Sequence, residues 1–250
     1  MEPIVWKLIL LFIVGNICGV INVNAGGGSS LTLPALIFLG LEPSVANGTN
    51  RIGILIQNLS AIGSFRHQKV HAFKTSLLMA LFTLPGAILG AMLSIRLDDL
   101  WFKRILSVVM IGIVISMIAG KHTRDKTEIH KKTRKWLIYP AMVLIGVYGG
   151  FLQIGVGFLL MAALFHILRL HLVHVNMHKV FIIFIYTLPA LLVFALTGNV
   201  NWGYGLVLAA GSSFGAWWGA RIAVRGGDRI IRLLLAIAIL LMALKLLGVF

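Results

Sequence analysis

The sequence predicts an all-α integral membrane protein made of two inverted-topology repeats of about five membrane segments each. Of its 250 residues, 59% are hydrophobic and 12% are charged, and the mean hydropathy is +0.99. A soluble domain is about half apolar and about a quarter charged. Several apolar runs are long enough to cross a bilayer as helices, and similar features recur in the two halves of the chain.

The apolar runs give the expected segments in chain order. The run 4–25 holds one charge, Lys7, and is too long for the apolar core of a signal peptide, so we interpret it as a structural helix. The polar stretch 121–135 is expected to be a basic cytoplasmic linker between a first transmembrane repeat at 1–120 and a second at 136–250. The expected segments are 4–25, 30–41, 52–65, 75–95, 101–120, 136–154, 156–168, 180–197, 202–220 and 230–249.

The two halves match at several points in the same order. Residues 85–92 match 214–221, and 27–36 match 155–164. In the second of these registers, the pair 50–51 falls on 178–179. An internal repeat of about 125 residues is the simplest explanation. Chance similarity between Gly/Ala-rich helices is the alternative.

The topology follows from the charges, which are 22 Lys and Arg against 7 Asp and Glu, for a net charge of +15. Basic residues of membrane proteins concentrate in cytoplasmic loops, and no nucleic-acid-binding motif is present. With the linker inside and each broken run counted as two segments, most cations face the cytoplasm and both termini lie outside. An odd number of segments per half then inverts the second repeat. Parallel repeats of about four crossings each are the alternative, and they would place either the linker or the 221–232 cations outside.

Two glycine-rich breaks interrupt the first apolar run of each half, at 26–30 and at 149–157. Non-helical backbone inside a bilayer persists only where protein or a water-filled cavity satisfies its polar groups, and paired breaks point to a transporter's binding site. The helix after each break would present free N–H groups and its positive dipole end to an anion. A helix kink or a tight packing contact is the alternative. The candidate substrate-binding residues here are Gly27, Gly28, Ser29, Ser30, Gln153, Gly155 and Gly157.

A second polar cluster lies at 46–51 and is matched by 174–179. It supplies amide, hydroxyl and imidazole groups, and each copy ends in a cation, which suits a planar or tetrahedral oxyanion. The cations could instead reach the membrane interface, and Asn47 and Thr49 could cap a helix. The candidate substrate-binding residues here are Asn47, Thr49, Asn50, Arg51, Asn176, His178 and Lys179.

All seven acidic residues lie near predicted segment ends or in loops. Without a carboxylate at mid-membrane, a cation substrate and sodium or proton coupling are disfavoured. His171, His174 and His178 share one helical face and could bind a metal, but no carboxylate or cysteine accompanies them, so we expect no metal and no cofactor. Cys18 is the only cysteine, which excludes an intramolecular disulfide. No catalytic motif is present, and we expect no enzymatic activity.

The order of these features resembles the TauE/SafE sulfite exporter family, also known as the toluene sulfonate uptake permease family. The resemblance implies a membrane permease for sulfur-containing anions such as sulfite, sulfoacetate or related organosulfonates. Ala162 stands where the first half has Pro34, and His178 stands where it has Asn50, so the two half-sites are unequal. The motifs that carry the resemblance lie at 26–36, 46–51, 155–157, 176–179, 198–202 and 211–221.

Together these features predict a secondary transporter of small sulfur-containing oxyanions, with alternating access to a site between two broken helices. Export is favoured, because moving one negative charge outward through 100 mV, inside negative, yields about 2.3 kcal/mol. We expect a multi-pass protein of the bacterial inner membrane. Its expected partners are a small anionic substrate and membrane lipid, not nucleic acid, and a homodimer is one arrangement considered. A histidine-based metal-binding membrane protein and a non-transporting membrane scaffold are the alternatives.

Overall fold

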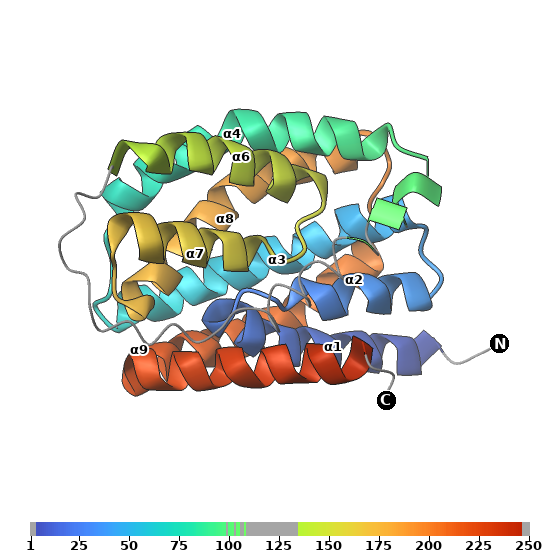
Figure 1. Ribbon diagram of the computed structural model, residues 1–250. Coiled ribbons are helices and arrows are strands. Elements are labelled where there is room, and N and C mark those ends of the chain that lie inside the picture. The colour runs from blue at the N-terminus through green and yellow to red at the C-terminus, as the bar shows by residue number, and fades with distance from the viewer. Residues whose placement is uncertain (1–3, 99, 103, 106–107, 109–134, 247–250) are drawn as a thin grey trace.

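The computed structural model describes residues 4–98, 100–102, 104–105, 108 and 135–246, and these residues form helices and turns without a β-strand (Figure 1). The expected segment 101–120 and the linker 121–135 therefore lie almost wholly outside the described residues. In chain order the elements are α1 (Ile4–Asn24), α2 (Ser29–Phe38), α3 (Pro43–His67), α4 (Phe73–Ile95), the 3-10 turn η1 (Lys135–Leu137), α6 (Ile138–Phe151), α7 (Val156–Leu168), α8 (Leu172–Leu196) and α9 (Trp202–Leu246).

Three of the described helices are long and apolar enough to cross a membrane: Val5–Asn24 in α1, Lys74–Ile95 in α4, and Leu172–Leu196, which is α8. Large apolar side chains lie on their outer surfaces. Leu89 and Leu192, for example, are each 57% exposed. Apolar surface of this kind suits lipid better than water. The expectation of an all-helical membrane protein is therefore confirmed.

Several expected helix boundaries are wrong. α3 begins at Pro43 and α8 at Leu172, well before the expected starts at 52 and 180. The polar clusters therefore lie inside helices, because tertiary hydrogen bonds satisfy their side chains. Pro43 suits the first position of α3, where its missing N–H is not needed. α9 also continues through the turn expected between 220 and 230, where its two glycines cost only about 1 kcal/mol each.

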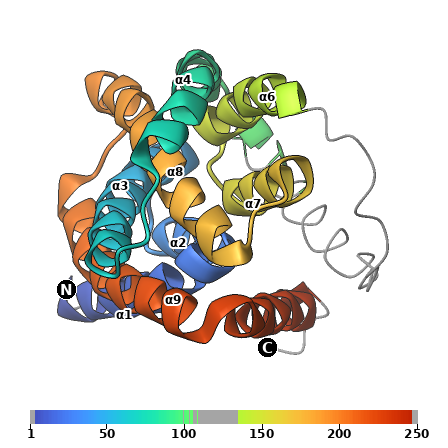
Figure 2. The ribbon, with the colours of Figure 1, turned by 90° about the vertical axis from the view of Figure 1, so that its left-hand side faces the viewer.

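Helices from the two halves of the chain interleave to form two bundles (Figure 2). α1 and α3 pack against α9, and α2 packs against α1 and α3. α6 and α8 pack against α4, and α7 packs against α6 and α8. We call α1, α2, α3 and α9 the first bundle, and α4, α6, α7 and α8 the second bundle. Contacts between α3 and α8 join the two bundles.

Corresponding helices of the two bundles run in opposite directions in Figure 1. α1 starts near the labelled N-terminus at the right of the view and runs to the left. α6 starts at the left and runs to the right. Each of these helices is followed by a turn and a short helix that returns alongside it, namely α2 and α7.

Glycines allow the helices to approach closely within each bundle. In the second bundle, a Cβ atom on Gly86 of α4 would collide with the Val143 carbonyl of α6. In the first bundle, a Cβ atom on Gly215 of α9 would collide with the Asn16 carbonyl of α1. Both glycines belong to pairs at helix-contact spacing, so these pairs serve helix packing.

Candidate functional site

The glycine-rich turns of the two halves meet between the bundles. The chain is not helical at 25–28, between α1 and α2, or at 152–155, between α6 and α7. Gly26 has a φ angle of 86° and Gly155 one of 70°, a left-handed conformation that glycine adopts without strain. A Cβ atom on Gly26 would collide with the backbone of Gly157. The two halves therefore touch here through their backbones.

Arg51, on α3 of the first bundle, binds the C-terminal end of α6 in the second bundle. The side chain is fully buried, and its guanidinium donates to the carbonyls of Gly149 (3.2 Å) and Gly150. It also donates to Oε1 of Gln153 at 3.2 Å, and its Cζ lies 4.6 Å from the ring centroid of Phe194. A cation in this position satisfies free helix-end carbonyls and interacts favourably with the helix dipole.

Lys179, on α8 of the second bundle, binds the C-terminal end of α1 in the first bundle. Its fully buried Nζ donates to the carbonyls of Asn22 at 3.0 Å and Val23 at 2.8 Å. A third hydrogen bond, of 2.8 Å, goes to Oδ1 of Asn176. These bonds engage the three N–H donors of an ammonium group. Full burial excludes the membrane-interface alternative for both cations.

An asparagine accompanies each cation. Asn47 Nδ2 donates to the carbonyl of Phe151 at 2.9 Å, and Asn176 Nδ2 donates to the carbonyl of Asn24 at 3.4 Å. Asn47 thus binds the end of another helix rather than the start of its own. Each helix that precedes a glycine-rich turn is therefore capped from the opposite bundle. We call these contacts the crossed caps: Arg51 with Asn47 on α6, and Lys179 with Asn176 on α1.

A small polar cavity lies within the first bundle, among α1, α2, α3 and α9. Its volume is about 10 Å³, the room of about one water. Asn50 and Gln57 border it, are 1% and 3% exposed, and have amide nitrogens without a hydrogen-bond partner in the described part of the chain. Thr32 Oγ1 donates to Asn50 Oδ1 at 2.7 Å, so the free atom of Asn50 is a donor. Ser29, Cys18 and Ser212 also line this polar cavity.

The matching position in the second bundle has different chemistry. In the register that pairs Asn50 with His178, Gln57 falls on the apolar Ile185. His178 Nδ1 lies 2.7 Å from the hydroxyl of Ser76 on α4, so the imidazole is already paired. The polar side chain in the first bundle is thus replaced by an aliphatic one in the second.

The other predicted residues divide between the polar cavity and its surroundings. Gly28 and Ser29 line the polar cavity at the start of α2. Ser30 Oγ donates to the carbonyl of Gly27 at 2.7 Å and thereby supports the turn. Thr49 Oγ1 accepts from the amide of Asn201 at 2.8 Å, in the loop before α9, and is not part of the cavity lining.

Sequence reasoning missed Gln57, Ser212 and Tyr186. Gln57 lies two helical turns after Asn50, and this i, i+7 spacing in an apolar run is the signal that could have found it. Ser212 reaches the polar cavity from α9, a contact between distant parts of the chain that no local pattern indicates. Tyr186 accepts from Gln153 Nε2 at 3.0 Å and so holds Gln153 near Arg51.

The histidines of the second half do not assemble a ligand set. Over the described ranges, no three His, Cys, Asp or Glu side chains come together as metal ligands would. His171 occupies the N-cap position of α8, and His178 pairs with Ser76. Nothing in the described geometry therefore favours the metal-binding alternative.

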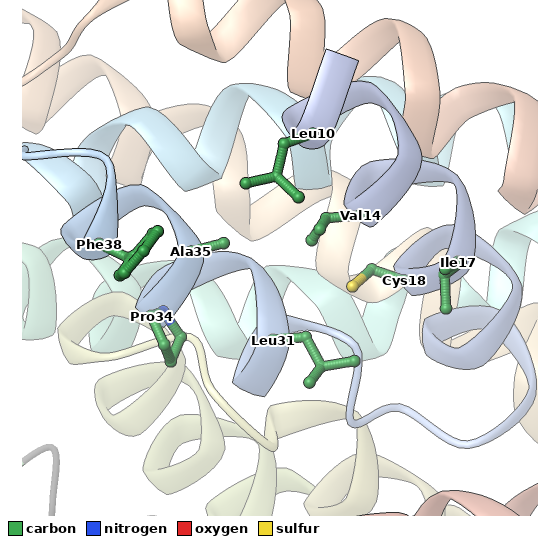
Figure 3. Close-up of a pocket in the computed structure, with 8 residues that line it drawn as sticks. All are labelled: Leu10, Val14, Ile17, Cys18, Leu31, Pro34, Ala35 and Phe38. Carbon is green, nitrogen blue, oxygen red and sulfur yellow. The ribbon is translucent and has the colours of Figure 1, made fainter. Parts of the chain in front are cut away.

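An apolar groove of about 490 Å³ lies between α1 and α2 (Figure 3). Phe38, at the end of α2, is 77% exposed, so the groove opens to the outside of the molecule. The buried Cys18 side chain borders both this groove and the polar cavity. The groove is lined by Leu10, Val14, Ile17, Cys18, Leu31, Pro34, Ala35 and Phe38.

Comparison with known proteins gives consistent matches over nearly the whole chain. A "Probable membrane transporter protein" of Haemophilus influenzae is 29% identical over 240 residues, covering 95% of this chain and 93% of the relative. "Probable membrane transporter protein ORF9" of a Sinorhizobium species is 31% identical over 242 residues, covering 96% and 92%. "Probable membrane transporter protein YfcA" of Escherichia coli K12 is 28% identical over 238 residues, covering 95% and 88%.

No solved structure matches the chain. The family model described as "Sulfite exporter TauE/SafE" matches residues 11–246, which include both glycine-rich turns and both crossed caps. The chain therefore belongs to the TauE/SafE sulfite exporter family of membrane transporters.

Proposed function

We propose that the protein is a secondary transporter that moves small sulfur-containing oxyanions, such as sulfite, sulfoacetate or related organosulfonates, out of the cell. The observation that carries this proposal is the polar cavity, whose free buried atoms are amide donors. The oxygens of sulfite and sulfonate groups accept hydrogen bonds, and charged acceptors bind such donors more strongly than neutral ones do. Family membership agrees with this substrate class.

The charges of the interior support an anion rather than a cation. Glu42 and Asp98 are exposed at helix ends, and no carboxylate is among the buried polar side chains of the described residues. Arg51 follows Asn50 directly on α3, so a fixed positive charge lies in the same part of the interior. Among the described residues, a metal cation or a quaternary amine would therefore find no buried carboxylate as a partner.

We further propose that α1–α2 and α6–α7 are the starts of two inverted-topology repeats. Their opposite directions, the contact between Gly26 and Gly157, and the matching crossed caps support this arrangement. Transporters with inverted repeats alternate access by moving one bundle against the other around a site near the bilayer midplane. In this protein such a movement would open the polar cavity to one side of the membrane and then to the other.

The proposed substrate-binding set has two parts. Ser29, Asn50 and the backbone of the first glycine-rich turn would face the substrate, because they border the polar cavity. Most of the remaining predicted residues would shape the site from behind, since they do not border the polar cavity and their side chains make hydrogen bonds elsewhere. These supporting residues are Asn47, Thr49, Arg51, Gln153, Asn176, His178 and Lys179.

We propose that the protein lies in the bacterial inner membrane, which is negative inside, so that the membrane potential favours export of an anion. One negative charge moving outward through 100 mV gains about 2.3 kcal/mol, which sustains roughly a 50-fold gradient. Uptake against this potential would require a coupled cation, and the buried polar groups of the described residues include no carboxylate to bind one.

Flux through proteoliposomes tests the proposal. Liposomes containing the purified full-length protein are loaded with sulfite, sulfoacetate, thiosulfate or sulfate, and efflux is measured with the membrane potential clamped at zero or at an inside-negative value. We expect efflux of sulfite or sulfoacetate that the inside-negative potential accelerates.

Protein-free liposomes and the variant Leu188→Ala provide the controls, because Leu188 is 44% exposed on the outer surface of α8. If none of the four anions crosses faster than in protein-free liposomes, the transporter proposal is wrong. Efflux that a potential of either sign leaves unchanged would contradict movement of a net charge.

A further inference from the structure

Two buried donors that lack a partner among the described residues border the polar cavity, and both come from α3. Asn50 Nδ2 and Gln57 Nε2 are buried and have no partner over the described ranges. Buried polar groups in native proteins are nearly always hydrogen-bonded, so an unpaired one calls for an explanation. Two such groups of the same kind beside one cavity point to a ligand with at least two acceptor atoms.

We infer that the substrate binds on one side only, in the polar cavity of the first bundle, where the amide nitrogens of Asn50 and Gln57 donate to two oxygens of the same sulfite or sulfonate group. This inference rests on the proposed function and adds Gln57 as a substrate ligand. Asn50 Oδ1 already accepts from Thr32. The two fully buried atoms of this pair that lack a partner in the described chain, Asn50 Nδ2 and Gln57 Nε2, are both donors, and an oxyanion supplies the acceptors they need.

The second bundle has no amide at either matching position of α8, and among the described residues its unpaired buried side-chain group is a single hydroxyl, Thr187 Oγ1. Ile185 stands at the position of Gln57 and has no polar atom, and His178, at the position of Asn50, is bound to Ser76. Lys179 is engaged in its crossed cap, and both terminal nitrogens of Arg51 donate in the other, which leaves the Arg51 Nε without a partner among the residues that the structure describes. Asn50 and Gln57 border the polar cavity, whereas Arg51 is not among the residues that line it. The neutral amides are thus the groups placed to contact the substrate.

The polar cavity must widen to admit an oxyanion, because its present volume suits about one water. α2 is the wall best able to move. It is 10 residues long, and glycines with positive φ angles lie at both of its ends, Gly26 at 86° and Gly40 at 98°. α7, its counterpart, ends at Arg169 instead, a non-glycine residue in the left-handed conformation. The apolar groove beside α2 gives the helix room to shift.

Binding measurements on purified full-length protein test this inference separately from transport. Thermal unfolding in detergent is followed by tryptophan fluorescence during titration with sulfite and, in parallel, sulfoacetate, and the shift in midpoint gives an apparent Kd. We expect Gln57→Met and Asn50→Leu each to weaken binding by about 10- to 100-fold, because each removes one hydrogen bond to a charged group. Gln57→Glu keeps the side-chain shape but opposes an anion, and it should abolish binding.

Ile185→Met is the matched control in the second bundle and should leave the apparent Kd unchanged. If Gln57→Met, Gln57→Glu and Asn50→Leu all bind as tightly as the wild type, the inference is wrong, even if proteoliposomes transport sulfite. If the wild type neither binds nor transports any of the anions, both proposals fail. Binding that depends on Gln57 without any flux would support the site and overturn only the transport function.

Discussion

The two bundles share a backbone plan but differ in what their interiors contain. Each has a helix pair joined by a glycine-rich turn, and each receives a cation and an amide from the other bundle at the end of the helix before that turn. The first bundle has a polar cavity with two unpaired amides, whereas the second has Ile185 and a paired His178 at the matching positions. The contacts that the bundles share hold the helices together, and the polar cavity of the first bundle is a better candidate for the substrate site than the matching position in the second.

This comparison explains why the most conspicuous charges are poor guides to the substrate. Arg51 and Lys179 make similar contacts, each with backbone carbonyls at the end of a helix in the other bundle, as a structural role requires. Gln57 has no polar counterpart in the second bundle, and its donor is free. A feature present on one side only is the better candidate for recognising an asymmetric or singly bound ligand.

The largest effect is expected from removing a crossed cap. Arg51→Ala and Lys179→Ala each leave helix-end carbonyls unpaired and open a void, so each should lower the free energy of unfolding by about 3–5 kcal/mol. Thermal unfolding in detergent measures the change, with Arg66→Ala, an exposed cation on α3, as the control. Strong destabilisation by only one of the two variants would show that the two crossed caps do not contribute equally to stability.

The contact between the glycine-rich turns should be nearly as sensitive. Gly26→Ala places a side chain against the backbone of Gly157 and also strains a positive φ angle, and it should destabilise the protein by about 2–5 kcal/mol. Gly40→Ala is the matched comparison, because its φ angle is also positive but open space surrounds it. We expect only about 1–2 kcal/mol there. Equal effects in the same unfolding assay would argue against a tight contact between the halves.

Exchanging the side chains that differ between the bundles should separate stability from function. Gln57→Leu removes an unpaired buried amide, so it should raise the free energy of unfolding by about 1–2 kcal/mol while it reduces anion efflux. Ile185→Gln should lower the free energy of unfolding by about 1–3 kcal/mol, because it puts an amide in place of a partly buried aliphatic side chain. Chemical unfolding and proteoliposome efflux are measured on the same preparations. A stabilised Gln57→Leu variant with normal efflux would show that transport does not need the Gln57 amide in the polar cavity.

The smallest effect is expected at Thr49, which the sequence places in the binding cluster. Thr49→Val removes the acceptor for the Asn201 amide and should lower stability by about 1 kcal/mol. The apparent Kd for sulfite should not change, because the hydroxyl is outside the polar cavity lining. A loss of affinity at Thr49 comparable to that at Gln57 would mean that the site extends toward the loop before α9.

Much of the architecture could be predicted from local patterns. The apolar runs correctly indicated helices near 4–25, 30–41, 75–95 and 156–168, because hydrophobic length and glycine punctuation are local signals. The starts of α3 and α8 were placed too late, since a polar run such as 46–51 looks like a loop. It is helical because its side chains bind groups far away in the sequence, as Asn47 does with Phe151.

The site was predicted less completely for the same physical reason. The polar cluster at 46–51 indicated Asn50, which adjoins a cation, but this local pattern ends at Arg51 and does not include Gln57. Gln57 follows the apolar stretch 52–56 with no charged neighbour, and Ser212 lies on a helix from the other half. Only the packing of α3 against α9 brings them to one cavity. The roles of Arg51 and Lys179 likewise depend on which carbonyls lie nearby, which no local sequence pattern encodes.

The interleaving of the halves also constrains the order in which the protein can assemble during synthesis. α1 leaves the ribosome well before α9, against which it packs, and before α8, which holds the lysine that caps its end. Contacts of such long sequence separation form late and slowly. Until α8 and α9 are made, the C-terminal carbonyls of α1 lack their lysine cap, and the surface of α1 that packs against α9 is uncovered. A nascent chain halted before α8 would be an open target for quality-control proteases, while the completed chain would be closed to them.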